Sequence, residues 1–281
     1  MRYERPMPTS ARHSNPAARS CCAAIALIIA VMATACHTDT PREPVAPLRL
    51  FGAGATEASV RDEIGAFQTQ SKLTVDLTFG AVGALRDKVL AGEPADVVIV
   101  TPAIITMLDA QQLVHAGSQV NLGRVGGGLA VKAGTPAPAI GTAEQFKQAL
   151  LAADEVYYAD PAVATAGATL MKVVDSMGIG DQVRAKGHLA PGGKEAMQAM
   201  TQSTAAHAVG VTQLSEILSV PEATLVGPYP AELNVAKTVY TAIILEHSER
   251  LADAQKLVQF LAGAEFQTRL AQSGFEPVPA N

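Results

Sequence analysis

Residues 48–91 repeat one pattern twice, in which a short strand runs into a loop of very small residues and the loop opens a helix. The first copy begins Leu48-Arg-Leu-Phe-Gly-Ala-Gly-Ala-Thr56, and the second begins Leu73-Thr-Val-Asp-Leu-Thr-Phe-Gly-Ala-Val-Gly83. Glycine and alanine let backbone N–H groups approach a ligand, and a helix N-terminus offers partial positive charge and unpaired donors. Either loop alone is more typical of an ordinary strand–helix connection. Two in succession, at the carboxyl edge of a parallel sheet, indicate a cradle for a small anion.

The alternation of strands and helices continues beyond this pair. Ala95-Asp-Val-Val-Ile-Val100 is a nearly continuous apolar run, as in a strand that helices cover on both faces. Thr101-Pro102 then begins a helix, because proline fits the first helical turn. The resulting order, βαβαβα, predicts an α/β fold with a parallel, doubly wound sheet and right-handed crossovers.

A glycine-rich strand at residues 124–132 marks the predicted crossing into a second α/β lobe, because glycine inside a strand indicates a bend or a close approach. Small loops open helices there as well, at Ala166-Gly167 and at Gly192-Gly193. A strand at residues 238–244 and two closing helices return the chain to the first lobe. We therefore predict two doubly wound sheets joined by two crossings, with a ligand cleft between the lobes. The predicted boundaries are residues 48–124 plus 238–281 for lobe 1 and residues 125–237 for lobe 2.

The N-terminal 47 residues are typical of a targeting segment followed by a tether. An apolar run at residues 21–32 follows a positively charged region that contains Arg12 and Arg19, and it is short for a transmembrane helix. The sequence Ala33-Thr-Ala-Cys36 is similar to the cleavage box of bacterial lipoproteins. We therefore predict a signal peptide over residues 1–35, a lipid on Cys36 that anchors the protein to a membrane, and a proline-rich tether over residues 36–47. Plain secretion, with Cys36 incidental, is the alternative.

Composition argues against several classes of partner and site. The net charge is −5 and basic residues do not cluster beyond the N-terminal segment, which argues against nucleic acid. Aromatic residues make up only 4% and tryptophan is absent, so a groove that stacks sugars is not expected. All three cysteines, Cys21, Cys22 and Cys36, lie in or beside the targeting segment. We therefore expect neither a disulfide nor a cysteine metal site in the rest of the chain.

The chain beyond the tether lacks the common catalytic patterns. Its histidines are scattered, and Gly-x-Ser-x-Gly and phosphate-loop motifs are absent. Lys194, beside Gly193, is able to give charge to an anion, although an exposed position is the more typical role. Ser215-Glu216 is interpreted as the start of a helix. We therefore predict a binding protein and not an enzyme.

Several pieces of sequence are informative through their order along the chain, although none is specific alone. They are Leu50-Phe-Gly-Ala-Gly-Ala55, Phe79-Gly-Ala-Val-Gly-Ala-Leu85, Ala91-Gly-Glu-Pro-Ala-Asp-Val97, Tyr158-Ala-Asp-Pro161 and Gly210-Val-Thr-Gln-Leu-Ser-Glu-Ile217. With these pieces in this order, nearly all of residues 48–279 resembles the bacterial extracytoplasmic solute-binding proteins of the molybdate-binding type.

The resemblance implies the two-lobed periplasmic-binding-protein fold and the role of substrate-binding component of an ABC importer. It implies a small anionic ligand, an ABC transporter membrane permease as partner, and a periplasmic, monomeric protein without cofactor or metal. The alternative is a degenerate relative of these proteins with a signalling or scaffold role and no transport.

The resemblance also implies a site in which hydroxyl groups and backbone N–H groups hold an oxyanion between the lobes. The predicted ligand-binding residues are Gly54, Ala55, Thr56, Val82, Gly83, Ala166, Gly167, Gly193, Thr212 and Gln213. The family's two loop serines fall on Ala55 and Val82, and its ligand tyrosine falls on Thr212 or Gln213. Each missing hydrogen bond weakens the binding of a buried anion by about 1–3 kcal/mol. We therefore expect molybdate to bind weakly, and a carboxylate is an alternative ligand.

Overall fold

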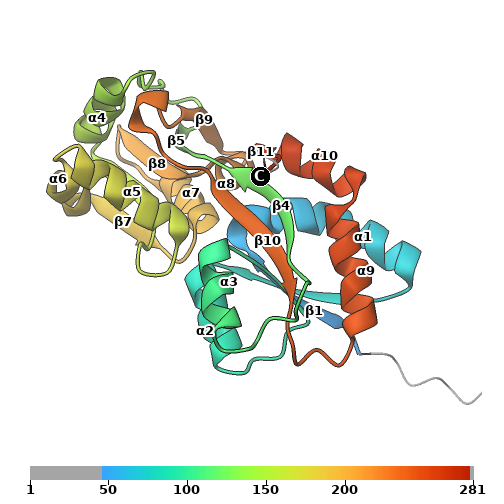
Figure 1. Cartoon of the computed structure of the whole chain (residues 1–281). Coiled ribbons are helices and arrows are strands. Elements are labelled where there is room, and N and C mark those ends of the chain that lie inside the picture. Colours follow the sequence, from blue (N-terminus) through green and yellow to red (C-terminus); the bar gives the residue numbers. More distant parts are fainter. Residues whose placement is uncertain (1–45, 279–281) are drawn as a thin grey trace, which may run out of the picture. The chain divides into compact units, whose positions relative to one another are not determined.

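The structure is a computed structural model, and it describes residues 46–278. The predicted signal peptide, the lipid on Cys36 and nearly all of the predicted tether lie outside the described residues. The chain from Val45 onward forms one compact unit. Its strands form two sheets, and helices cover both of them (Figure 1).

The first sheet has the strand order β11-β4-β10-β3-β1-β2. Strand β1 runs parallel to β2 and β3, whereas β10 runs antiparallel to β3 and β4, and β11 runs antiparallel to β4. The parallel arrangement predicted from the first three strands is therefore confirmed for β1, β2 and β3. Strand β10, which brings the chain back to this sheet, runs in the opposite direction to its neighbours β3 and β4. The bounds are Leu48–Ala53 (β1), Val75–Gly80 (β2), Val97–Val100 (β3), Val120–Val125 (β4), Thr238–Ile244 (β10) and Phe275–Glu276 (β11).

Helices pack on both faces of the first sheet. Helix α2 contacts α3, whereas α10 contacts both α1 and α9, and Figure 1 shows these two groups on opposite sides of the strands. The strands are buried between them, and residues such as Val98 and Ile243 belong to one core with the apolar faces of the helices. The bounds are Glu57–Ser71 (α1), Val82–Leu90 (α2), Pro102–Asp109 (α3), Leu251–Ala262 (α9) and Ala264–Gln272 (α10), and a 3-10 turn at Gly54–Thr56 leads into α1.

The second sheet has the strand order β7-β6-β8-β5-β9. Strand β6 is parallel to β7 and β8, and β5 is antiparallel to β8 and β9. Successive side chains of a strand point to opposite faces, so Leu129 packs against α4 and α5 while Ala130 packs against α7. The bounds are Gly127–Lys132 (β5), Glu155–Ala159 (β6), Gly187–Ala190 (β7), Ala208–Gln213 (β8), Ala223–Pro228 (β9), Ala143–Ala152 (α4), Thr165–Ser176 (α5), Gly180–Ala185 (α6), Gly193–Gln202 (α7) and Leu214–Leu218 (α8).

The chain passes from the first sheet to the second at Gly126 and returns through residues 229–237. The glycine-rich strand predicted at residues 124–132 is therefore two strands, β4 and β5, which belong to different sheets. We use the names first lobe and second lobe for each sheet with its helices. The predicted boundaries, 48–124 plus 238–281 and 125–237, stay a proposal about separate domains, since the contacts join both lobes in one unit.

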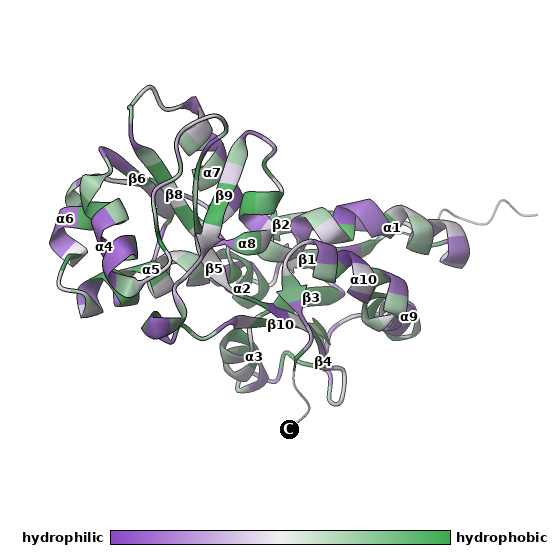
Figure 2. Ribbon diagram, turned by 90° about the horizontal axis from the view of Figure 1, so that it is seen from above, coloured by the Kyte–Doolittle hydropathy of each residue, from purple (hydrophilic) through white to green (hydrophobic). Residues whose placement is uncertain are grey.

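Hydrophobic residues concentrate in the strands of both lobes. Figure 2 shows strands β3 and β8 in the hydrophobic colour, and hydrophilic patches on outer helices such as α1 and α4. Within residues 46–278, no helix has the length and apolarity needed to cross a membrane. A cavity lies between the lobes, where several helices begin.

Candidate functional site

A cavity of about 190 Å³ lies where both lobes contribute loops and helix starts. Helices α2, α5 and α7 each place their first residues in its lining, and the turn that leads into α1 does the same. The first N–H groups of a helix have no partner within the helix, so these four starts offer donors and partial positive charge. The arrangement is suited to an anion, as the sequence predicts.

Six of the ten predicted site residues line this cavity. They are Gly54, Ala55, Val82, Ala166, Gly193 and Gln213. Between them the wall is mainly aliphatic, because alanine side chains from both lobes face the space. The lining thus combines backbone donors with a hydrocarbon surface.

The other four predicted residues have different surroundings. Thr56 is fully buried and its hydroxyl donates to the Ala53 carbonyl at 2.8 Å. Gly167 lies against the backbone of β6, where a Cβ atom would come within 1.9 Å of a carbonyl oxygen. Gly83 faces the other lobe, and Thr212 bonds a neighbouring side chain. None of these four belongs to the described lining of the cavity.

Gly83 joins the two lobes. Its N–H donates to the carbonyl of Val163, in the second lobe, at 2.9 Å. A Cβ atom at Gly83 would come within 2.8 Å of that carbonyl oxygen and 3.1 Å of the Val163 Cα atom. Glycine is therefore needed at this position because the two backbones approach each other closely.

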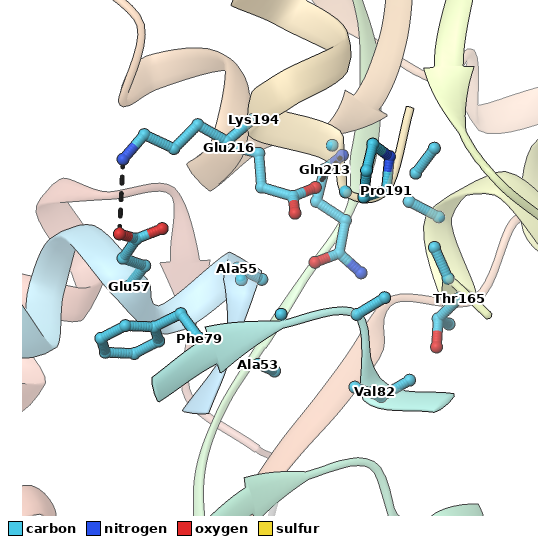
Figure 3. A pocket seen from close by; sticks show the side chains of 18 of the residues that line it. Ala53, Ala55, Glu57, Phe79, Val82, Thr165, Pro191, Lys194, Gln213 and Glu216 are labelled. Atoms are coloured by element: carbon cyan, nitrogen blue, oxygen red, sulfur yellow. Dashed lines mark hydrogen bonds and ion pairs between the residues drawn. The ribbon is translucent and has the colours of Figure 1, made fainter. Parts of the chain in front are cut away.

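Gln213 presents its amide to the cavity in a fixed orientation (Figure 3). The hydroxyl of Tyr240 donates to the Gln213 amide oxygen at 2.8 Å. Burial raises the pKa of Tyr240, so this hydroxyl keeps its proton and stays a donor. Because the amide oxygen is occupied, the NH₂ group of Gln213 remains as a donor for a ligand.

Glu216 lies beside Gln213 and is 8% exposed. Its Oε2 atom accepts from the Thr212 hydroxyl at 2.5 Å and from the Gln213 N–H at 3.4 Å. The backbone N–H of Gly193 also favours the ionised form of this carboxyl group and so lowers its pKa. Burial raises the pKa of Glu216, and these hydrogen bonds oppose the shift in part.

Gly193 makes this arrangement possible. A Cβ atom there would come within 2.0 Å of the Thr212 hydroxyl and 2.1 Å of the Glu216 Oε2 atom. Any other residue at the first position of α7 would therefore displace the pair. The small loop predicted from Gly192-Gly193 thus has two roles, since it exposes N–H groups and makes room for a buried carboxyl.

An ion pair crosses between the lobes beside the cavity. Lys194 of α7 approaches Glu57 of α1, with 3.5 Å between Nζ and Oε1, and Figure 3 marks this contact. Glu57 also accepts from Arg61 at 2.7 Å. The side chain of Lys194 is 30% exposed and that of Glu57 is 15% exposed. Because both residues line the cavity, Lys194 is close enough to exchange its partner for a bound anion.

Sequence reasoning missed the polar side chains that come from outside the small loops. Glu57, Thr165, Glu216 and Tyr240 all line the cavity. The start of a helix near Ser215-Glu216 is right, since α8 begins at Leu214, but the carboxyl group was not predicted to face the cavity. The spacing of four between Thr212 and Glu216 is the sequence feature that allows their contact.

Comparison with known proteins agrees with this geometry. The family model described as bacterial extracellular solute-binding protein matches residues 48–276. The periplasmic molybdate-binding protein of Azotobacter vinelandii superposes with a TM-score of 0.70 at 18% identity, over 83% of this chain and 100% of that chain. The sulfate-binding protein SubI of Mycobacterium tuberculosis H37Rv superposes with a TM-score of 0.64 at 19% identity, over 83% of this chain and 88% of that chain. These structures confirm the two-lobed α/β fold.

One relative of this chain is named as an enzyme and not as a binding protein. The chain is 29% identical to an aconitate isomerase of a Pseudomonas species over 244 residues, which covers 85% of this chain and 90% of that protein. The residues that line the cavity, of which Ala53 is the first in the sequence and Tyr240 the last, all lie within the part of the chain that the family model matches.

Proposed function

Because the chain belongs to the bacterial extracellular solute-binding protein family, we propose that its cavity binds a small organic carboxylate for import by an ABC transporter. The observation that carries the choice of ligand is the composition of the cavity wall. Ala55 and Val82 stand where the resemblance to molybdate-binding proteins implies hydroxyl donors, while the helix starts, Gln213 and Lys194 still offer donors. A wall with aliphatic surface and a few placed donors suits an anion that has a carbon skeleton.

The binding function is tested by thermal melting with a panel of anions. The panel contains succinate, tricarballylate, cis- and trans-aconitate, phosphate, sulfate and molybdate. A ligand present at about 100 times its dissociation constant raises the free energy of unfolding by roughly 2.7 kcal/mol. We expect at least one carboxylate to raise the melting temperature more than molybdate does. A panel in which only molybdate or sulfate acts would contradict the proposal.

Lys194→Met tests whether the cavity is the binding site. A hydrogen bond to a charged group contributes about 1.5–3 kcal/mol, so the substitution should weaken carboxylate binding by roughly tenfold or more. Lys172→Met is the matched control, since Lys172 is exposed on α5 and does not line the cavity. Equal binding by both variants and the unmodified protein, measured by titration calorimetry, would place the ligand elsewhere.

A second candidate function is isomerisation of a bound tricarboxylate. The similarity to an aconitate isomerase over most of both chains favours it, together with a buried carboxyl group in the cavity. Aconitate has three carboxylates and one carbon–carbon double bond. A base can take a proton from its CH₂ carbon, the double bond moves by one position, and the proton is returned to the carbon that was vinylic. The reaction needs no oxidant, and Glu216 is the candidate to accept and return the proton.

The two candidates give different results with the same substrate. Incubation with cis-aconitate, followed by separation of the isomers, measures conversion directly. Binding without conversion supports the solute-binding role alone. Conversion that Glu216→Gln abolishes would establish the isomerase function instead.

We also propose a periplasmic location, a lipid anchor at Cys36, a membrane permease as partner and a monomeric state. Family membership supports the first and third of these, and the sequence Ala33-Thr-Ala-Cys36 supports the second. Cell fractionation tests the anchor, because Cys36→Ser should move the protein from the membrane fraction to the soluble fraction. A protein that is soluble without the substitution would contradict the lipid anchor.

A further inference from the structure

The two oxygen atoms of the Glu216 carboxyl group have different surroundings. The Oε2 atom is held by the hydroxyl of Thr212 and by the backbone N–H group of Gln213. The Oε1 atom lies toward Gly54, where a Cβ atom would be 3.2 Å away, and both residues line the cavity. Within residues 46–278, no hydrogen bond to Oε1 is found. One oxygen is therefore fixed, and the other is available to a ligand.

The charged groups around Glu216 do not neutralise it. On α7, Glu195 adds negative charge and raises the pKa of Glu216, and Lys194 pairs instead with Glu57 of α1. On β10, the phenol of Tyr240 is neutral and donates to Gln213. An ionised Glu216 would thus place a negative charge beside an incoming anion, with little water to screen it.

We propose that a carboxylate ligand binds together with a proton on Glu216, whose Oε1–H group donates to the ligand. The proton comes from solvent when Glu216 is ionised in the free protein, so one added proton removes the negative charge that would otherwise lie beside the ligand. A protonated Glu216 is a donor and not a base, so this inference rests on the proposed binding function and not on the isomerase alternative.

The hydrogen bonds to Oε2 explain how a proton is confined to Oε1. Because Oε2 accepts from two donors, the remaining site for a proton is the oxygen that faces the cavity. Burial favours the neutral form of the carboxyl, in agreement with the raised pKa of this group. A neutral O–H beside a carboxylate gives a short, charge-assisted hydrogen bond, which a fixed negative charge at the same place would prevent.

Titration calorimetry with tricarballylate tests the proposal. Tricarballylate is a saturated tricarboxylate that cannot isomerise, and at about pH 8 its carboxyl groups are ionised, so any proton taken up on binding goes to the protein. Apparent enthalpies in two buffers with different ionisation enthalpies give the number of protons. We expect an uptake that approaches one proton per ligand as pH rises, with a dissociation constant that increases up to about tenfold per pH unit.

Two variants identify the carboxyl group. Glu216→Gln keeps a donor at the same place, so its proton uptake should vanish and its affinity should become independent of pH. Glu265→Gln is the control, since Glu265 is exposed on α10 and does not line the cavity, and it should keep both the uptake and the pH dependence. Binding without proton uptake in the unmodified protein, or uptake that persists in Glu216→Gln, would overturn the proposal.

A measurement without ligand separates this inference from the binding function. Since the folded protein holds the Glu216 proton above the ordinary pKa of 4.5, the unmodified protein loses stability as pH rises from that value through the raised pKa. The difference in melting temperature, Glu216→Gln minus the unmodified protein, should therefore increase as pH rises. If tricarballylate does not bind, the proposed ligand fails, and a difference in melting temperature that is constant with pH would overturn the inference independently.

Discussion

Gly193→Ala should destabilise the protein although alanine is the better helix former. The new Cβ atom would come within 2.0 Å of the Thr212 hydroxyl and 2.1 Å of Glu216 Oε2, so this hydrogen-bonded pair must separate. A hydrogen bond to a charged group, such as the one from Thr212 to an ionised Glu216, contributes about 1.5–3 kcal/mol. Alanine regains at most about 1 kcal/mol of helix propensity. The expected net loss in the free energy of unfolding is therefore about 0.5–2 kcal/mol.

Gly65→Ala is a matched control with the opposite expected sign. Gly65 lies inside α1, is exposed, and a Cβ atom there would meet nothing within 4 Å. Alanine in an exposed helix interior should stabilise the protein by about 0.5–1 kcal/mol. Urea denaturation measures both changes, and for a protein of this size 1 kcal/mol corresponds to about 2–4 °C in melting temperature. If both substitutions shift stability in the same direction, the close packing around Gly193 does not have the role described.

Two further substitutions test the contacts that shape the cavity. Gly83→Leu should hold the lobes apart, because the leucine side chain would meet the backbone of Val163. We expect weaker ligand binding and a larger radius of gyration in X-ray scattering. An unchanged radius and affinity would contradict the inter-lobe role of Gly83. Tyr240→Phe removes the hydroxyl that orients the Gln213 amide. One neutral hydrogen bond contributes about 0.5–1.5 kcal/mol, so calorimetry should show roughly three- to tenfold weaker binding. Unaltered affinity would show that the amide needs no such orientation.

The fold was largely predictable because local patterns agree with it. The apolar run that ends at Val100 forms the buried strand β3, and the small residues after Phe51 and Phe79 open helices as expected. The direction of β10 was not predictable in this way. A strand that returns from another lobe has the same periodicity whether it runs parallel or antiparallel, so only the tertiary path decides its direction.

The candidate site was predictable where backbone groups form it and not where side chains do. Loops of glycine and alanine at Gly54 and Gly193 are visible in the sequence, and both line the cavity. Glu216 was hidden, because a glutamate three positions into a short helix is usually solvated or caps the helix. Its contact with the cavity depends on the glycine of α7 that packs against it. The role of Gly83 likewise depends on the other lobe, which local sequence does not describe.

The choice of ligand class is the central claim, and competition calorimetry between tricarballylate and molybdate tests it most directly. Each anion is titrated alone into the full chain, and tricarballylate is then titrated in the presence of excess molybdate. The aliphatic wall and the missing hydroxyls at Ala55 and Val82 predict that tricarballylate binds with a stoichiometry of about one and that molybdate displaces it poorly. Tight binding of molybdate, with tricarballylate bound weakly or not at all, would contradict the account.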